Sequence, residues 1–117
     1  MFSDKDMNKI ENLLGKQCKF VGTLSGKGLL KIDGIIDGDI IWDDNILLES
    51  SSICIGNISC KNAVINGKVQ GNILCEDALT IQGSGQIIGD ITMNTLVINE
   101  GGSFTGNCNM KLNESHE

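Results

Sequence analysis

The sequence predicts an all-β chain folded as a single-domain parallel β-helix, or β-solenoid, of about five to six coils. Three observations support this prediction: a short motif that recurs five times, apolar residues that alternate with period two within each copy, and the absence of proline. At 117 residues the chain is long enough for one domain with a sizeable core, and nothing in it indicates a second domain.

The recurring motif is a glycine, then Asn or Asp, then an apolar residue. A pair of apolar residues separated by one position precedes each copy, and the first members of these pairs are 16 or 17 residues apart. A unit of this length cannot bury its own apolar side, but stacked copies can, so each copy is expected to form one coil of a solenoid. The five copies begin at Gly38, Gly56, Gly71, Gly89 and Gly106.

Within each copy, apolar residues occupy every second position. This period places alternate side chains of a strand on opposite faces, so one set points inward. Five positions in each copy are expected to face inward, and all of them are apolar. One column of this expected core consists of Ile40, Ile58, Ile73 and Ile91.

Glycine is expected to recur at the corners of the coils, because a sharp turn between strands needs a positive φ or leaves no room for a Cβ. Two of the five residues that directly follow these glycines are Asp, and Asn residues lie between them in the stack. Like charges therefore do not lie directly above one another when the coils are in register. The lack of proline fits strands that donate backbone amides to neighbours on both sides. The position after the glycine holds Asp39, Asn57, Asn72, Asp90 and Asn107.

The repeat divides the chain into a β-helix body over residues 17–112, an N-terminal tail over residues 1–16 and a polar C-terminal tail over residues 113–117. Both tails are expected to be short and flexible. Helical periodicity appears only near the start, where it predicts a short amphipathic helix that caps the first coil. The apolar face of this helix would consist of Met7, Ile10, Leu13 and Leu14.

Charge and composition argue against several classes of protein. The formal net charge is −6 and Lys and Arg total nine, whereas a nucleic-acid binder needs a basic surface, so no nucleic acid is expected as a partner. No phosphate-loop motif is present, so neither a nucleotide nor another cofactor is expected. No apolar run approaches the length of a membrane span and no leader is recognisable, so a cytoplasmic location is expected.

No residue is a good candidate for catalysis or for metal binding, and the chain is predicted not to be an enzyme. The one histidine, His116, lies in the polar tail. The five cysteines include no C-x-x-C pair and are expected to be free thiols in a reducing cytosol. Cys60 and Cys75 would share an inward column in neighbouring coils, where buried structural thiols are favoured over a metal site because the column supplies no further zinc ligand.

With this pattern in view, the chain resembles the bactofilin family over nearly its whole body. The resemblance rests on the Leu30-Leu-Lys-Ile-x-Gly opening, the recurring Gly-[Asn/Asp]-Ile turns and the closing segment from Glu100 to Met110. It implies a right-handed β-helix that polymerises end to end, without a nucleotide, into non-polar filaments. It also implies a scaffold for cell shape or protein localisation at the inner face of the cell membrane, with cell-wall or morphogenesis proteins as partners besides the chain itself.

Self-association is expected at the two ends of the solenoid, because terminal coils expose unpaired strand edges and an open apolar core. The same residues are expected to plug the core, and the two roles are compatible. At the N-terminal coil the expected contact residues are Phe20 and Leu24. At the C-terminal coil they are Phe104, Cys108, Met110 and Leu112.

Family members carry an N-terminal tail that targets the membrane, and Met1 and Phe2 resemble its start. Three acidic residues offset the three lysines of residues 1–16, so capping of the first coil is favoured over membrane binding. One alternative function is a hexapeptide-repeat acyltransferase, which predicts strict six-residue spacing and a catalytic histidine. The other is a β-helical binding module that does not polymerise.

Overall fold

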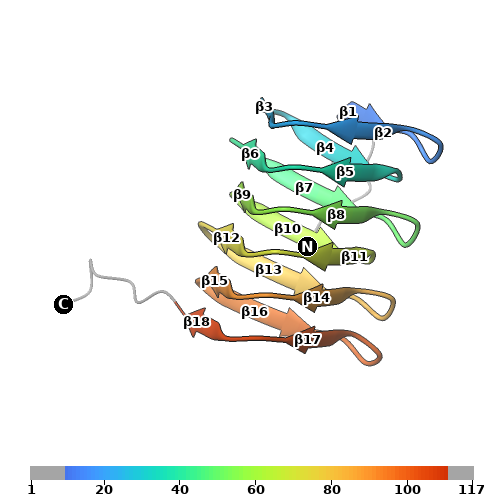
Figure 1. Cartoon of the computed structure of the whole chain (residues 1–117). Helices are drawn as coiled ribbons and strands as arrows, with labels where there is room; N and C mark the ends of the chain where they lie inside the picture. The colour runs from blue at the N-terminus through green and yellow to red at the C-terminus, as the bar shows by residue number, and fades with distance from the viewer. Residues whose placement is uncertain (1–9, 111–117) are drawn as a thin grey trace.

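The computed structural model describes residues 10–110, which form eighteen β-strands (Figure 1). The strands belong to three parallel sheets of six strands each. Successive strands lie in different sheets, so three strands make one coil and the coils stack along one axis. The predicted parallel β-helix is confirmed, with six coils among the described residues.

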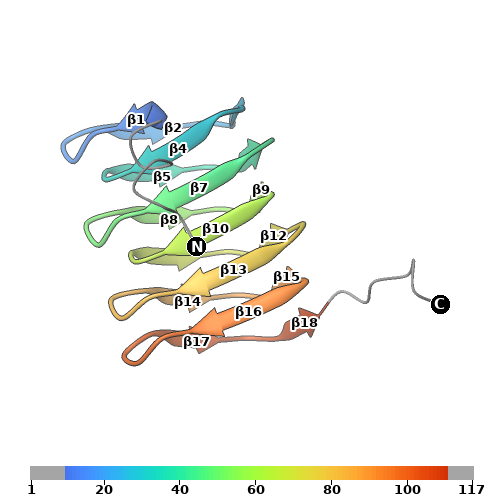
Figure 2. The same cartoon turned by 180° about the vertical axis from the view of Figure 1, so that it is seen from behind.

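Each sheet takes one strand from every coil. Sheet A consists of β1 (Ile10–Leu14), β4 (Leu29–Ile32), β7 (Asn45–Leu48), β10 (Asn62–Ile65), β13 (Ala78–Ile81) and β16 (Thr95–Ile98), and faces the viewer in Figure 2. Sheet B consists of β2 (Lys19–Val21), β5 (Ile35–Asp37), β8 (Ile53–Ile55), β11 (Lys68–Gln70), β14 (Gln86–Ile88) and β17 (Ser103–Thr105). Sheet C consists of β3 (Leu24–Gly26), β6 (Ile40–Trp42), β9 (Ile58–Cys60), β12 (Ile73–Cys75), β15 (Ile91–Met93) and β18 (Cys108–Met110).

The coils pair in register, so equivalent residues stack above one another along the axis. In sheet C, Ile73 pairs with Ile58 on one side and with Ile91 on the other. These side chains and Ile40 are fully buried in one continuous core. Branched aliphatic side chains of similar size therefore fill the layers of the core one above another.

The repeated corner glycine has a positive φ and also lies where there is no room for a Cβ. Its φ lies between 145° and 150° in all five copies, a region that side chains with a Cβ rarely adopt. A Cβ built on Gly71 would also clash with the carbonyl oxygen of Gly56 in the coil before it. Glycine at this corner allows the backbones of successive coils to approach closely.

The helix predicted near the start is wrong, because Ile10–Leu14 form strand β1 and pair in parallel with β4. The spacing of its apolar residues fits a helix, but the edge of β4 offers backbone partners, and this tertiary pairing overrides the local pattern. The pairing contains a bulge between Ile10 and Asn12. The β-helix therefore begins before residue 17, while residues 1–9 and 111–117 lie outside the described residues.

Candidate assembly surfaces at the two ends of the solenoid

The two ends of the solenoid differ from its middle in their backbone pairing. Strands of the four middle coils pair with a strand on each side, whereas β1, β2 and β3 at one end and β16, β17 and β18 at the other have one neighbour each. Within residues 10–110, no strand covers the outer edges of these six strands. An open edge of this kind is a template for pairing with another chain.

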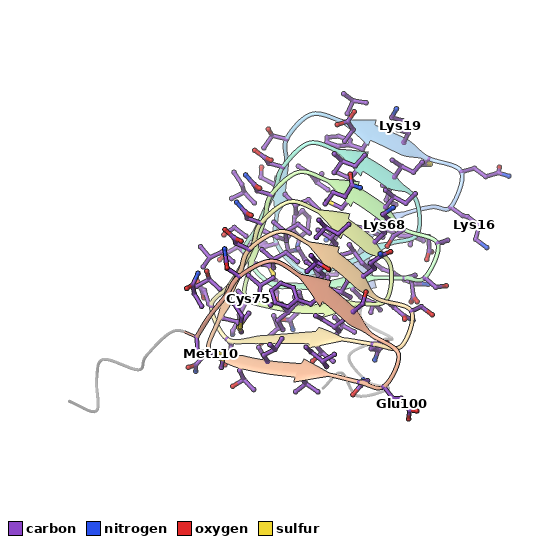
Figure 3. The ribbon with its side chains drawn as sticks, turned by 60° about the horizontal axis from the view of Figure 1, so that its bottom comes forward. Lys16, Lys19, Lys68, Cys75, Glu100 and Met110 are labelled. Atoms are coloured by element: carbon purple, nitrogen blue, oxygen red, sulfur yellow. The ribbon has the colours of Figure 1, made fainter. Side chains whose placement is uncertain are left out.

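The last coil leaves its core side open. Ile98 is 47% exposed and Met110 is 52% exposed, although both occupy inward positions of the repeat. Leu96 and Phe104 are half-buried and pack against the core, and Cys108 is exposed. Figure 3 looks toward this end and shows Met110 at the tip of β18. The equivalent residues one coil earlier are fully buried: Leu79, Ile81, Ile87, Ile91 and Met93.

Sulfur atoms gather on the inner side of sheet C, where Cys60, Cys75, Met93 and Met110 share one inward column and Cys108 ends the neighbouring column of isoleucines. The Cys108 Sγ lies 3.9 Å from the Sδ of Met93 and 3.9 Å from the Sδ of Met110. Further inside, the Cys60 and Cys75 Sγ atoms lie 3.7 Å apart, as their shared column predicts. These soft side chains adapt to irregular gaps, which suits the open end of a stacked core.

The buried thiols have the properties of structural cysteines. The hydrogen bond between Cys60 and Cys75, together with burial, raises the pKa of the Cys60 thiol. A thiol whose pKa is raised by burial stays protonated and is a poor nucleophile and metal ligand. Among residues 10–110 there is no group of three or more His, Cys, Asp or Glu side chains that could hold a metal ion.

The first coil forms a recess rather than a protruding surface. Its inward residues Leu14, Phe20 and Leu24 are half-buried and pack against the core. The recess has a volume of about 340 Å³. It is lined by Glu11, Asn12, Leu13, Leu14, Phe20, Leu24, Leu30 and Trp42.

Trp42 partly closes the core beneath this recess. Its indole N–H donates a hydrogen bond of 2.6 Å to the carbonyl oxygen of Gly28. Gly26 precedes Trp42 in the same inward column, and a Cβ on Gly26 would lie only 2.8 Å from the tryptophan ring. The Asn12 Nδ2 donates to the carbonyl oxygen of Lys27 at 3.0 Å and so ties β1 to the segment before β4.

The structure brings together Phe104, Cys108 and Met110 at one end and Phe20 and Leu24 at the other. Leu112 of the expected contact set, and Met1 and Phe2 of the tail, lie outside the described residues. The repeat analysis did not assign Ile98 to the C-terminal surface, although its inward parity was visible in the sequence. It also missed the part played by Asn12, which lies outside the repeat and gives no periodic signal. Trp42 and Gly26 occupy one inward column of the repeat, but their contact at the N-terminal end was not predicted.

No helix among residues 10–110 is long and apolar enough to cross a membrane.

Comparison with known proteins gives one family match and one similar solved structure. The family model described as "Bactofilin: Polymer-forming cytoskeletal" matches residues 12–109. The bactofilin of Thermus thermophilus, reconstructed by cryo-electron microscopy as double helical filaments, is similar with a TM-score of 0.77 and 20% sequence identity. The match covers 86% of this chain and 99% of the Thermus chain, which shows a shared fold. No curated protein matches the chain significantly.

Proposed function

The chain belongs to the bactofilin family of polymer-forming cytoskeletal proteins, and on this basis we propose that it assembles end to end through its first and last coils, without a nucleotide, into non-polar filaments. The observation that carries this proposal is the exposed inward side of the last coil, where Ile98 and Met110 are about half exposed. Apolar residues in a core position lose that exposure only when another layer stacks on them.

Burial of this surface provides the driving force for assembly. Each Å² of apolar surface removed from water contributes about 25 cal/mol, and the open strand edges of the last coil can pair at the same time. In a non-polar filament, C-terminal coil meets C-terminal coil and N-terminal coil meets N-terminal coil, so each contact is symmetric and self-complementary.

Neither burial of the apolar surface nor pairing of the strand edges requires a nucleotide. The sequence contains no G-x-x-x-x-G-K-[ST] motif, and assembly by burial and strand pairing needs no hydrolysis to proceed. The family is a structural one, and a hexapeptide-repeat acyltransferase would need a catalytic histidine, whereas the one histidine of this chain is His116.

We further propose that the filament acts as a scaffold at the inner face of the cell membrane, where it supports cell shape or places other proteins. This part of the proposal rests on the family. A rigid rod with a repeating surface presents the same binding sites at regular intervals, which suits the recruitment of cell-wall or morphogenesis proteins.

The test compares wild type with Phe104→Arg and Thr105→Arg, two neighbours on β17 of which Phe104 points inward and Thr105 lies on the exposed face. In reducing buffer without nucleotide, negative-stain electron microscopy should show filaments for wild type and Thr105→Arg. Phe104→Arg should give small particles with an unchanged β-sheet circular dichroism spectrum. Its critical concentration should rise on the order of 100-fold, because the charge would be buried in the contact.

Two outcomes would count against the proposal. If wild type remains a discrete monomer or trimer at high concentration, a β-helical binding module that does not polymerise is the better description. If Phe104→Arg forms filaments as readily as Thr105→Arg does, the last coil is not the assembly surface.

A further inference from the structure

Three sulfur atoms lie together on the inner side of the last coil. The Cys108 Sγ lies 3.9 Å from the Met93 Sδ and 3.9 Å from the Met110 Sδ. Cys108 and Met110 are the first and third residues of β18, so both side chains point to the same face of sheet C. Met110 pairs in register with Met93 on β15. Two neighbouring strands therefore hold one thiol beside two thioethers.

This sulfur group arises where the last coil departs from the repeat. The inward position of Cys108 is occupied by isoleucine in each of the four coils before it. An isoleucine in the last coil would extend this column with a side chain of the same shape, so core packing does not require a thiol at this position. The isoleucines of the column are Ile40, Ile58, Ile73 and Ile91.

The spacing of the sulfur atoms fits a single bound ion. Two sulfur atoms that bind one trigonal metal ion at about 2.3 Å each lie about 4 Å apart. Both sulfur–sulfur distances from Cys108 are close to this value. Thiolate and thioether are soft ligands that suit Cu(I), whereas zinc sites are built from cysteine, histidine and carboxylate side chains, of which this group has only Cys108.

We propose that Cys108, Met93 and Met110 form a binding site for one Cu(I) ion at the C-terminal end of the solenoid. On binding, the Cys108 thiol releases its proton to solvent and the thiolate bonds to the ion. The two thioethers each donate a lone pair. Copper remains Cu(I) throughout, so binding needs no oxidant or reductant, and the ion and the thiolate together carry no net charge beside the apolar core.

The site has a path by which the ion enters. Cys108 is exposed and Met110 is 52% exposed at the end of the solenoid (Figure 3), while Met93 is fully buried on the core side. The other close pair of sulfur atoms, in Cys60 and Cys75, lies 3.7 Å apart but is buried within the core. An ion therefore reaches the sulfur group of the last coil without opening the solenoid.

Copper binding does not depend on polymerisation, because all three sulfur atoms belong to one chain. The site does lie on the surface proposed for end-to-end contact, where assembly would cover it. The experiment therefore uses the full-length chain that stays in the supernatant after high-speed centrifugation. Loss of copper binding and loss of filaments are then measured separately.

Competition with the coloured Cu(I) chelator bicinchoninate, in oxygen-free buffer without thiol reductants, measures the affinity. We expect wild type to take up one Cu(I) per chain. Cys108→Ser should weaken binding by at least about 100-fold and Met110→Leu by at least about tenfold, because even an outer partner of a metal ligand contributes 10–100-fold to affinity. Cys18→Ser changes the other exposed cysteine and is the matched control, which should bind Cu(I) as tightly as wild type does.

Three results of the competition would overturn the proposal. If Cys108→Ser binds as tightly as wild type, the thiol is not a ligand. If Met110→Leu does, the thioether is not one, and this exposed position accepts leucine without a change in the core. One Cu(I) per two chains would assign the ion to the Cys108 thiolates of two copies.

X-ray absorption of the copper-loaded chain gives an independent test. We expect three sulfur neighbours at about 2.3 Å from the ion. Met93→Leu, which keeps the volume of a buried side chain, should reduce the number of sulfur neighbours to two. Nitrogen or oxygen neighbours in wild type, or an unchanged sulfur number in Met93→Leu, would contradict the site.

Discussion

At the scale of single residues, the corner glycines set how closely the coils stack. Gly71 has a φ of 147°, and a Cβ there would meet the carbonyl oxygen of Gly56. Gly71→Ala should therefore lower the free energy of unfolding by at least about 2 kcal/mol, through backbone strain and the clash together. Gly15→Ala is the matched control, since a Cβ at Gly15 meets nothing within 4 Å. Equal thermal midpoints for the two variants would contradict this explanation of the corner.

A second residue-scale prediction concerns Cys54, which is fully buried in sheet B. Burial, with a smaller effect of the Asp39 carboxylate, raises the pKa of the Cys54 thiol from its ordinary value of 9.0 to about 12. Between these pH values the unfolded chain loses the thiol proton and the folded chain keeps it. The unfolded state then binds fewer protons, so stability is fully present below pH 9 and falls as the pH rises toward 12.

Cys54→Val removes this pH dependence, and Val69 shows that valine fits the same column in the next coil. Relative to the variant, wild type should lose about 1.4 kcal/mol of unfolding free energy for each pH unit above 9. Denaturant unfolding at pH 8 and at pH 10.5 in reducing buffer measures the difference. Parallel pH profiles for the two proteins would show that the Cys54 thiol ionises equally in both states.

At the scale of elements, side chains at the corners tie one coil to the next. The Asp39 Oδ1 accepts a hydrogen bond from the backbone N–H of Asn57 at 2.9 Å, and the Asn57 Oδ1 accepts one from Asn72 at 3.0 Å. The Asn72 Oδ1 accepts from Asp90, and the Asp90 Oδ1 accepts from Asn107. The column in which Asn separates the two carboxylates is therefore also a hydrogen-bonded ladder.

Breaking one rung of this ladder should have a modest effect. Asn72→Ala removes the acceptor for the backbone N–H of Asp90 and should lower the free energy of unfolding by about 1 kcal/mol. Gln70→Ala, at an exposed position of β11, should change it by less than about 0.5 kcal/mol. Chemical unfolding followed by circular dichroism compares the two variants, and equal losses would contradict a role for the ladder.

Substitution of an inward residue should lower the free energy of unfolding far more than substitution of an outward residue of the same strand. Ile73 is buried in the core and its neighbour Leu74 is exposed on β12. Ile73→Ala should lower the free energy of unfolding by about 2–5 kcal/mol, through lost burial and the cavity that remains. Leu74→Ala should cost less than about 1 kcal/mol. A larger loss at Leu74 than at Ile73 would be incompatible with the strand's orientation.

The elements also show what the sequence can and cannot predict. Strands from β4 onward follow the repeat of 16 or 17 residues with glycine corners, so local pattern and tertiary fold agree. Strand β1 could not be predicted in the same way, because its conformation depends on pairing with β4 across a bulge. The repeat places Trp42 and Gly26 in one inward column, but the contact of the tryptophan ring with Gly26 depends on side-chain packing between coils, which a periodic pattern does not specify.

At the scale of the whole molecule, the middle coils are nearly interchangeable and the ends are not. Each middle coil buries its inward residues against two neighbours, whereas the last coil leaves Ile98 and Met110 half exposed. Solenoids that stay monomeric need terminal coils with a polar outer surface. Within residues 10–110 the last coil has no such polar layer, which makes further stacking the natural way to complete the core.

The direction of the strands within a filament tests end-to-end assembly most directly. If coil stacks on coil, all strands run across the filament, and X-ray diffraction from oriented filaments should show the reflection of about 4.8 Å along the filament axis. Wild-type filaments assembled without nucleotide are aligned in capillaries for this measurement, and we expect the reflection on the meridian. A reflection of the same spacing on the equator would mean that the solenoids lie across the filament and associate through their sheet faces, which would contradict assembly through the coil ends.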